Sequence, residues 1–152
     1  MTDPERQYAV EAFNRSWELL ESQRSPDQDA EALAAAFASR WHWSRIGGPE
    51  QLAVGDHQVA KVASALGFAG LALHFARRAW DCGQEQGWTD WRRAVFAEGM
   101  ARAHEAAGDT AARDEWLRTA ASALASVEDA EDREVVERQL REIPGWAVVS
   151  AG

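Results

Sequence analysis

The amino-acid sequence predicts an all-α protein of about seven antiparallel helices in one domain. Apolar residues recur at helical spacing along the whole chain, and no stretch alternates with the period of two that is typical of strands. Glycine and proline interrupt this pattern at only a few places. The 152 residues are enough for one domain with a core.

Capping residues and helix breakers place the boundaries of the expected helices. Asp3 suits an N-cap with Pro4 at the first helical position, and Gly47-Gly48-Pro49 cannot easily continue a helix. The expected helices span about 4–22, 27–46, 49–66, 69–83, 89–107, 110–127 and 129–142. The first six form three pairs over about 4–46, 49–83 and 89–127.

The last expected helix, over about 129–143, differs from the others in its charge. Val135, Val136, Leu140 and Ile143 share one side, whereas the rest of the segment from Glu128 onward is strongly charged. A helix that caps a helical array has one buried face and one solvated face. We therefore expect this segment to be a C-terminal capping helix with its charged side in solvent.

Two segments of the chain superimpose in register. In each, a helix rich in small residues ends at a glycine, and an alanine follows at the same distance, from Gly67 to Ala79 and from Gly108 to Ala120. This pattern resembles the tetratricopeptide repeat (TPR), in which alanines lie where two helices cross closely. The two glycines are 41 residues apart, whereas the standard repeat has about 34 residues. The resemblance implies a TPR-like right-handed superhelix of α-α hairpins over residues 1–152.

The resemblance also implies a concave groove lined by the first helix of each pair. The groove positions fall on His57, Lys61 and Ser64 in one copy, and on Glu98, Arg102 and Glu105 in the other. Elementary helix geometry agrees in part, because residues four apart share a face. The alternative to a groove is that these residues form a solvated helix face with one salt bridge. On the groove hypothesis, Glu98→Ala together with Arg102→Ala should leave folding nearly intact and weaken ligand binding.

Tryptophan is abundant, with eight in the chain. Helical spacing favours core positions for Trp17, Trp41, Trp80 and Trp116. Trp41 and Trp43 are about 200° apart on a helix and cannot share one face. Either both faces of that helix are covered, or one ring is exposed in a groove.

We take Trp43 and Trp91 as candidates for an aromatic wall of the groove. His42, beside Trp43, is a further candidate for orienting a ligand. A structural histidine held by a hydrogen bond is the alternative for His42.

Charge and composition exclude several classes of function. The net charge of −9 and the lack of a dense basic patch argue against nucleic acid and against an anionic membrane surface. No apolar run is long enough to span a bilayer and the N-terminus is polar, so we expect a cytoplasmic protein. The single cysteine, Cys82, allows neither an internal disulfide nor a thiolate zinc site. Lys61 is the only lysine, which we attribute to a genome that favours arginine codons, and we expect a bacterial source.

No motif indicates a catalytic residue, a metal or a cofactor. The chain lacks a phosphate-binding loop, a nucleophile elbow and a zinc-binding helix signature. The sequence therefore favours an interaction module that binds a short peptide, a partner protein or a small ligand in the groove, and a homodimer is a further option. The alternative is an enzyme or metal-dependent sensor that uses a pocket of His, Glu and Trp side chains. Its site could be built from His42, His57 and Glu98, or Lys61 could act as an activated amine.

Overall fold

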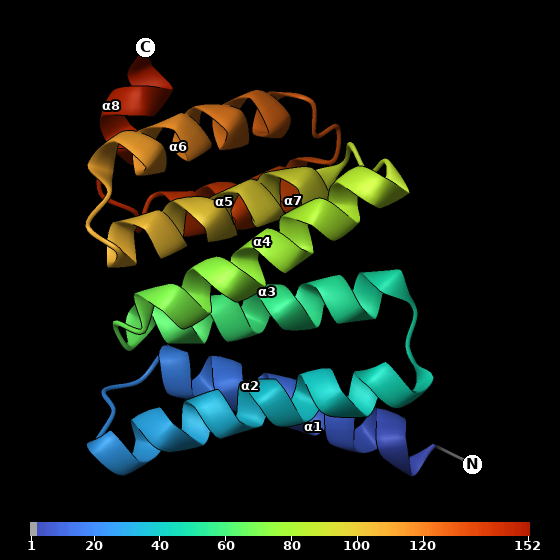
Figure 1. The fold of residues 1–152 in the computed structure, drawn as a ribbon. Coiled ribbons are helices and arrows are strands. Elements are labelled where there is room, and N and C mark those ends of the chain that lie inside the picture. Colours follow the sequence, from blue (N-terminus) through green and yellow to red (C-terminus); the bar gives the residue numbers. More distant parts are fainter. Residues whose placement is uncertain (1–2) are drawn as a thin grey trace.

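The computed structural model describes residues 3–152, and this part of the chain is entirely helical with no strand, which confirms the all-α prediction (Figure 1). It contains eight helices, one more than expected. Their bounds are α1 Pro4–Leu20, α2 Pro26–Ile46, α3 Pro49–Ala65, α4 Ala69–Gln86, α5 Trp91–Ala106, α6 Thr110–Ala125, α7 Ala130–Leu140 and α8 Trp146–Ala151.

Local signals in the sequence account for most helix ends. The Asp3 side chain accepts from the backbone N–H of Glu5 and caps α1, and Ser25 forms a capping box with Gln28 at the start of α2. Gly67 and Gly108, the two glycines of the repeat pattern, have φ values of 81° and 74°. Glycine adopts this left-handed conformation without steric strain, so each ends its helix in a tight turn.

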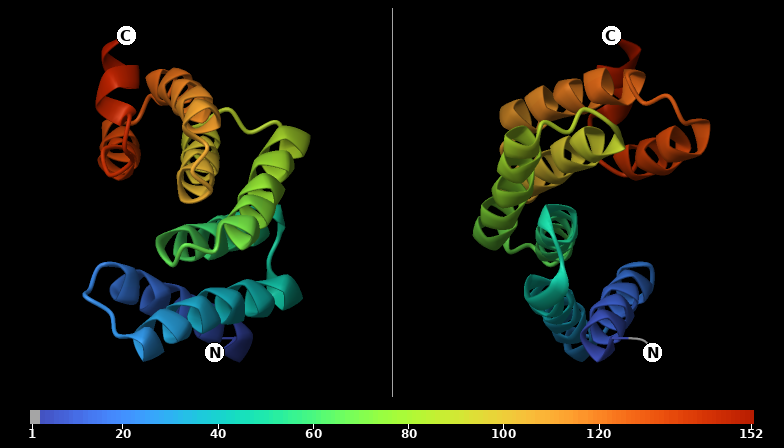
Figure 2. Two further views of the ribbon diagram at one scale, coloured as in Figure 1. Left: turned by 60° about the vertical axis from the view of Figure 1, so that its left-hand side comes forward. Right: turned by 90° about the vertical axis from the view of Figure 1, so that its right-hand side faces the viewer.

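From α1 to α7 each helix packs against the next one along the chain, and the odd-numbered helices also contact one another. α3 packs against α1 and α5, and α5 packs against α7, while α2, α4 and α6 pair with α1, α3 and α5. Figure 2 shows that the helix pairs follow an arc, so that α1 and α7 lie on the concave side. Residues of α1, α3, α5 and α7 together line the hollow of this arc.

The core between the helices is built largely from alanine. Ala60 and Ala76 lie in one cluster of fully buried residues, and Ala101 and Ala120 lie in another. Such small side chains allow helix backbones to approach closely, as the spacing of the alanines predicts. Among the helices of the described chain, none is long and apolar enough to cross a membrane.

Three sequence-based predictions about the helices are wrong in detail. α4 continues past Gly83 to Gln86 and ends at Gly87, which adopts a left-handed conformation. α8 was not expected, because Pro144-Gly145 interrupts the helical pattern, yet Trp146 is buried against α6 and stabilises this short helix. Val135 is exposed, because α7 presents Val136 and Leu140 to the core instead.

Trp41 is the clearest error among the predicted core residues. Its side chain is 57% exposed. Trp43 is half-buried, so the structure resolves the geometric conflict between the two rings by leaving Trp41 on the surface. The guanidinium of Arg45 covers the Trp41 ring at 5.0 Å from its centroid, and this contact shields part of the ring from water.

Candidate functional site

Four predicted groove residues, His57, Lys61, Glu98 and Arg102, come together where α3 packs on α5. Glu98 is 1% exposed, His57 5% and Lys61 6%. One carboxylate oxygen of Glu98 accepts from Arg102 Nε, and the other lies 3.4 Å from His57 Nε2. We call these four residues the buried charge cluster. Its burial means that each charge depends on its neighbours rather than on water.

Gln139 near the end of α7 and Glu142 just after this helix contact the buried charge cluster. Arg102 Nη2 donates to the main-chain carbonyl of Gln139 and to the carboxylate of Glu142, both at 2.9 Å. Lys61 Nζ donates to the side-chain oxygen of Gln139 at 3.0 Å. The expectation that this side of the capping helix faces solvent is therefore wrong for Gln139, which is half-buried, whereas Glu142 stays exposed while it pairs with Arg102. The packing of α7 on α5 turns them toward Arg102 and Lys61.

The burial also revises the expected outcome of the double alanine change. A carboxylate that is 1% exposed and bonded to a half-buried guanidinium is part of the architecture of the protein. Glu98→Ala with Arg102→Ala removes this pair, leaves a cavity and leaves Lys61 without its nearby carboxylate, so we now expect it to lower stability.

Gly99 is required where α5 crosses His57. A Cβ atom at position 99 would lie 2.6 Å from Nδ1 and 3.0 Å from Cε1 of His57. We expect Gly99→Ala to lower the free energy of unfolding by about 1 to 3 kcal/mol, because the imidazole would have to move within a packed core. Gly70→Ala is the matched control. A Cβ there meets nothing within 4 Å, so alanine should stabilise α4 by up to about 1 kcal/mol. Urea denaturation of both variants measures the difference, and equal stabilities would contradict the close crossing.

The ionisation of the buried charge cluster follows from burial and from the facing charges. Burial lowers the pKa of His57 to about 4, against the opposing effect of Glu98. Burial lowers the pKa of Lys61 to about 8, again opposed by Glu98. Burial by itself raises the pKa of Glu98, but Arg102 and the other nearby cations outweigh it and lower the pKa. At neutral pH the cluster therefore holds a neutral His57 and a charged Glu98.

His57 should make the protein sensitive to mild acid. Its pKa is lower in the folded chain than the ordinary 6.5, so between pH 6.5 and about 4 the unfolded chain binds a proton that the folded chain does not. Stability should therefore fall as the pH falls through this window. Urea denaturation at several pH values should show a smaller fall for His57→Gln than for the unchanged chain. Parallel curves would mean that His57 is not held neutral.

Lys61 has an unusual environment for an ammonium group. Its Nζ lies 4.2 Å from the centroid of the Trp17 ring and donates to the neutral side chain of Gln139. Within residues 3–152 it forms no ion pair with a carboxylate. A cation–π contact and a neutral hydrogen bond stabilise a charge only in part, so Lys61 remains able to bind an anion.

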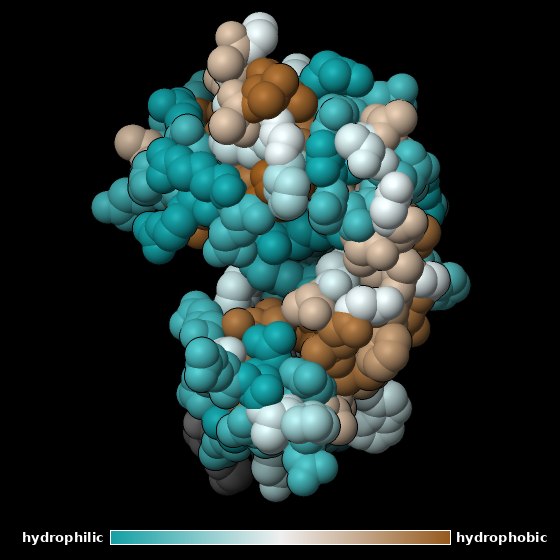
Figure 3. Space-filling view, turned by 90° about the vertical axis from the view of Figure 1, so that its left-hand side faces the viewer, coloured by the Kyte–Doolittle hydropathy of each residue, from teal (hydrophilic) through white to brown (hydrophobic). Residues whose placement is uncertain are grey.

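Lys61 opens onto a cleft of about 480 Å³, which we call the polar cleft. The hollow is visible in Figure 3, which views the molecule from the side where the α1–α2, α3–α4 and α5–α6 turns lie. The cleft is lined by residues from four different helices or their ends, including Trp17, Arg24, Lys61, Ser64, Arg102 and Glu142. The hydroxyl oxygen of Ser64 is buried and has no partner among the described residues. Lys61 and Ser64 therefore both offer donors to a ligand.

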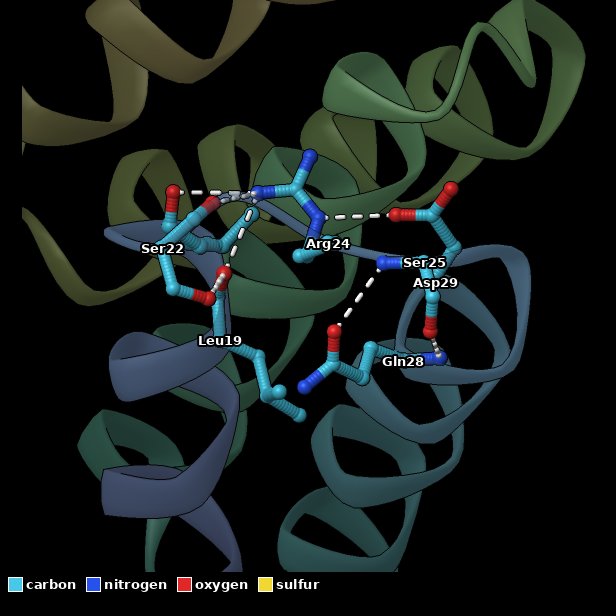
Figure 4. A network of polar contacts seen from close by, with 7 residues as sticks. Leu19, Ser22, Arg24, Ser25, Gln28 and Asp29 are labelled. Carbon is cyan, nitrogen blue, oxygen red and sulfur yellow. Dashed lines mark hydrogen bonds and ion pairs between the residues drawn. The ribbon is translucent and has the colours of Figure 1, made fainter.

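Arg24 is fixed at the rim of the polar cleft by the turn between α1 and α2. Its Nε donates to Asp29 at 2.8 Å, and its Nη1 donates to the carbonyls of Leu19 and Leu20, both at 3.1 Å (Figure 4). In the described chain no hydrogen bond is formed by Nη2 of Arg24. Nη2 of Arg24 can thus donate to a ligand while Nε and Nη1 keep their hydrogen bonds.

Apolar pockets adjoin the polar cleft along the concave side. One of about 290 Å³ is lined mainly by Phe13, Trp17, Val54, Trp91 and Val135, and His57 also reaches it. A second, of about 360 Å³, shares some of these residues and adds Trp43. Trp43 and Trp91 therefore line one pocket, as an aromatic wall would require. Trp17 lines both the polar cleft and the first apolar pocket.

His42 lies apart from the other predicted site residues. Its Nδ1 lies 2.7 Å from the carboxylate of Glu5, and its ring packs against Tyr8 and Trp41. It lines neither the polar cleft nor the apolar pockets. A site that combines His42 with His57 and Glu98 is therefore not assembled. In residues 3–152 no group of three His, Cys, Asp or Glu side chains is arranged to hold a metal ion.

Comparison with known proteins gives no match: no protein-family model fits the chain, and no curated protein or solved structure is significantly similar to it. The function must therefore be argued from the geometry alone.

Proposed function

We propose that the chain is a small interaction module that binds a short peptide, or another small ligand with a carboxylate, in the polar cleft. The observation that carries this proposal is Lys61, an ammonium 6% exposed that forms no ion pair within residues 3–152 and faces a cleft of about 480 Å³. Burying such a group lowers stability unless a counter-charge offsets it. A carboxylate from a ligand would supply that counter-charge.

The arrangement of donors supports a carboxylate in particular. Lys61, Ser64 and Arg24 all line this cleft, and they carry an ammonium, a hydroxyl and a guanidinium respectively. Charge-assisted hydrogen bonds of this kind are stronger than neutral ones. Trp17 adds an apolar face beside Lys61, which suits the side chain next to a peptide's terminal carboxylate.

We further infer a TPR-like array as the finer description of the fold. The support is the common glycine-to-alanine spacing of α3–α4 and α5–α6, the left-handed glycines at both turns, and the lining of the hollow by α1, α3, α5 and α7. The predicted groove positions Ser64 and Glu105 both line the polar cleft. In this description α7 and α8 close one end of the array.

Binding can be tested with acetyl-alanyl-alanine and its C-terminal carboxamide as a matched pair of probes. Native mass spectrometry first establishes whether the purified chain carries a ligand and whether it is a monomer or dimer. Isothermal titration calorimetry should then show the peptide acid binding and the amide binding at least about tenfold more weakly, because the amide loses a charged hydrogen bond.

Variants locate the peptide on the protein. Lys61→Met should abolish the preference for the acid, whereas Arg118→Met, which removes an exposed charge on α6, should not alter it. Equal binding of acid and amide to the unchanged chain, or an undiminished preference in Lys61→Met, would contradict the proposal.

A further inference from the structure

The amine of Lys61 in the polar cleft is a cation when protonated and a nucleophile when neutral. Lys61 is the only lysine in the sequence, and its amine lies against Trp17 and Gln139 at the wall of the cleft. We propose that Lys61 captures a small oxo acid, a molecule with an aldehyde or ketone beside a carboxylate, as a reversible imine. This rests on the proposed binding of carboxylates in the same cleft and names a ligand class for it.

The first requirement is an amine that can lose its proton. Burial disfavours the ammonium form and lowers the pKa of Lys61 to about 8. The charged groups that face it are Glu21 at the end of α1, Glu98 and Arg102 on α5, and Glu142 after α7. Arg102 also lowers the pKa, and the three carboxylates oppose the change without forming an ion pair with Nζ in the described chain. A useful fraction of the amine is therefore neutral and nucleophilic near pH 8.

The second requirement is a place for both ends of the ligand. The lone pair of Nζ attacks the carbonyl carbon, and the carboxylate one bond away must lie nearby. Ser64, one helical turn from Lys61, and Arg24 at the rim can donate to that carboxylate. The cleft volume of about 480 Å³ accommodates a molecule of this size.

The third requirement is that the product suits the site as well as the free amine does. The amine adds to the carbonyl, a proton moves from nitrogen to oxygen, and water leaves with one further proton taken up, so that the C=O bond becomes a protonated C=N bond. Like the resting ammonium, the product carries a positive charge, and it keeps one N–H. The Trp17 ring and the Gln139 oxygen can therefore retain their contacts. An acylated lysine would lose the charge, so the site favours carbonyl compounds over acyl donors.

Reductive trapping with glyoxylate tests this inference. The purified chain is incubated at pH 8 with glyoxylate and cyanoborohydride, and the labelled residues are located by peptide mass spectrometry. We expect label on Lys61 in addition to the α-amino terminus, and the label on Lys61 should form at least about tenfold faster than on Nα-acetyl-lysinamide, because far more of Lys61 is neutral at that pH. Lys61→Arg, which keeps the cation but removes the nucleophile, should take up no label at position 61, and labelling confined to the α-amino terminus would follow.

Two outcomes would overturn the inference. One is labelling of Lys61 no faster than the free model amine. The other is label on the α-amino terminus of the unchanged chain with none on Lys61. If acetyl-alanyl-alanine still binds in either case, the imine is wrong while the proposed carboxylate-binding function stands. If the peptide also fails to bind, both proposals fail.

Discussion

Glu98→Gln is expected to lower the free energy of unfolding by about 3 to 5 kcal/mol. The substitution keeps the size of the side chain and removes its charge. Glu98 is the carboxylate of the buried charge cluster, bonded to Arg102 and close to His57 and Lys61. Without it, the guanidinium of Arg102 loses the carboxylate that offsets its removal from water, and only Glu142 at the surface remains as its charged partner. Urea denaturation at pH 7 measures the loss.

Glu105→Gln is the matched control for this change. Glu105 lies about two helical turns further along α5 and pairs with Arg113, but its side chain is 39% exposed. Water screens such a pair, so its loss should lower the free energy of unfolding by less than about 1 kcal/mol. Should the two variants prove equally stable, the carboxylate of Glu98 would not be the counter-charge of the cluster.

Acid should act on Glu98 in the same direction as the substitution. Because the pKa of Glu98 is lower in the folded chain than its ordinary 4.5, its stabilising effect is complete above that value and is lost as the pH falls through the folded pKa. The effect of Glu98→Gln should therefore shrink at low pH. The fall in stability that His57 causes begins at a higher pH, at 6.5. The contributions of His57 and Glu98 to stability therefore begin to change at different pH values.

Helices and turns could be predicted because their causes are local. The capping residues Asp3 and Ser25 and the repeat glycines Gly67 and Gly108 act within a few positions of themselves. α8 could not be predicted, because it depends on Trp146 fitting against α6, a contact between segments distant in the chain. The error for Trp41 has the same origin: helical spacing identifies a stripe but does not say how far the neighbouring helix covers it.

Only part of the candidate site could be predicted from the sequence, and its burial could not. The spacing of His57 and Lys61, and of Glu98 and Arg102, placed each pair on one helix face. The depth of the cluster depends on α7, whose Gln139 and Glu142 looked like part of a solvated side. Trp17 and Arg24 were not expected at the site, because a tryptophan at helical spacing resembles core and the turn contacts of Arg24 are invisible in the sequence. The sequence likewise could not predict that the Ser64 hydroxyl is buried without a hydrogen-bond partner among the described residues.

Lys61→Met is expected to stabilise the protein by about 3 kcal/mol at pH 7, the opposite sign to Glu98→Gln. The pKa of Lys61 is about 8 in the folded chain against an ordinary 10.5, and each unit of difference corresponds to about 1.4 kcal/mol. Below pH 8 the folded protein carries this full cost of a buried ammonium. Methionine has a similar length, needs no counter-charge and can pack on the Trp17 ring.

The pH dependence gives this prediction a second readout. Between pH 8 and 10.5 the unfolded chain holds a proton on Lys61 that the folded chain has released, so the stability of the unchanged protein should rise with pH across this window. Lys61→Met should lack that rise, and Arg118→Met, an exposed control, should keep it and differ from the unchanged chain by less than about 0.5 kcal/mol at pH 7. A residue that lowers stability where methionine would raise it is typical of a functional site, because activity and stability often conflict there. If Lys61→Met were instead destabilising, Lys61 would be a structural member of the cluster, and the case for a ligand at its ammonium would lose its main support.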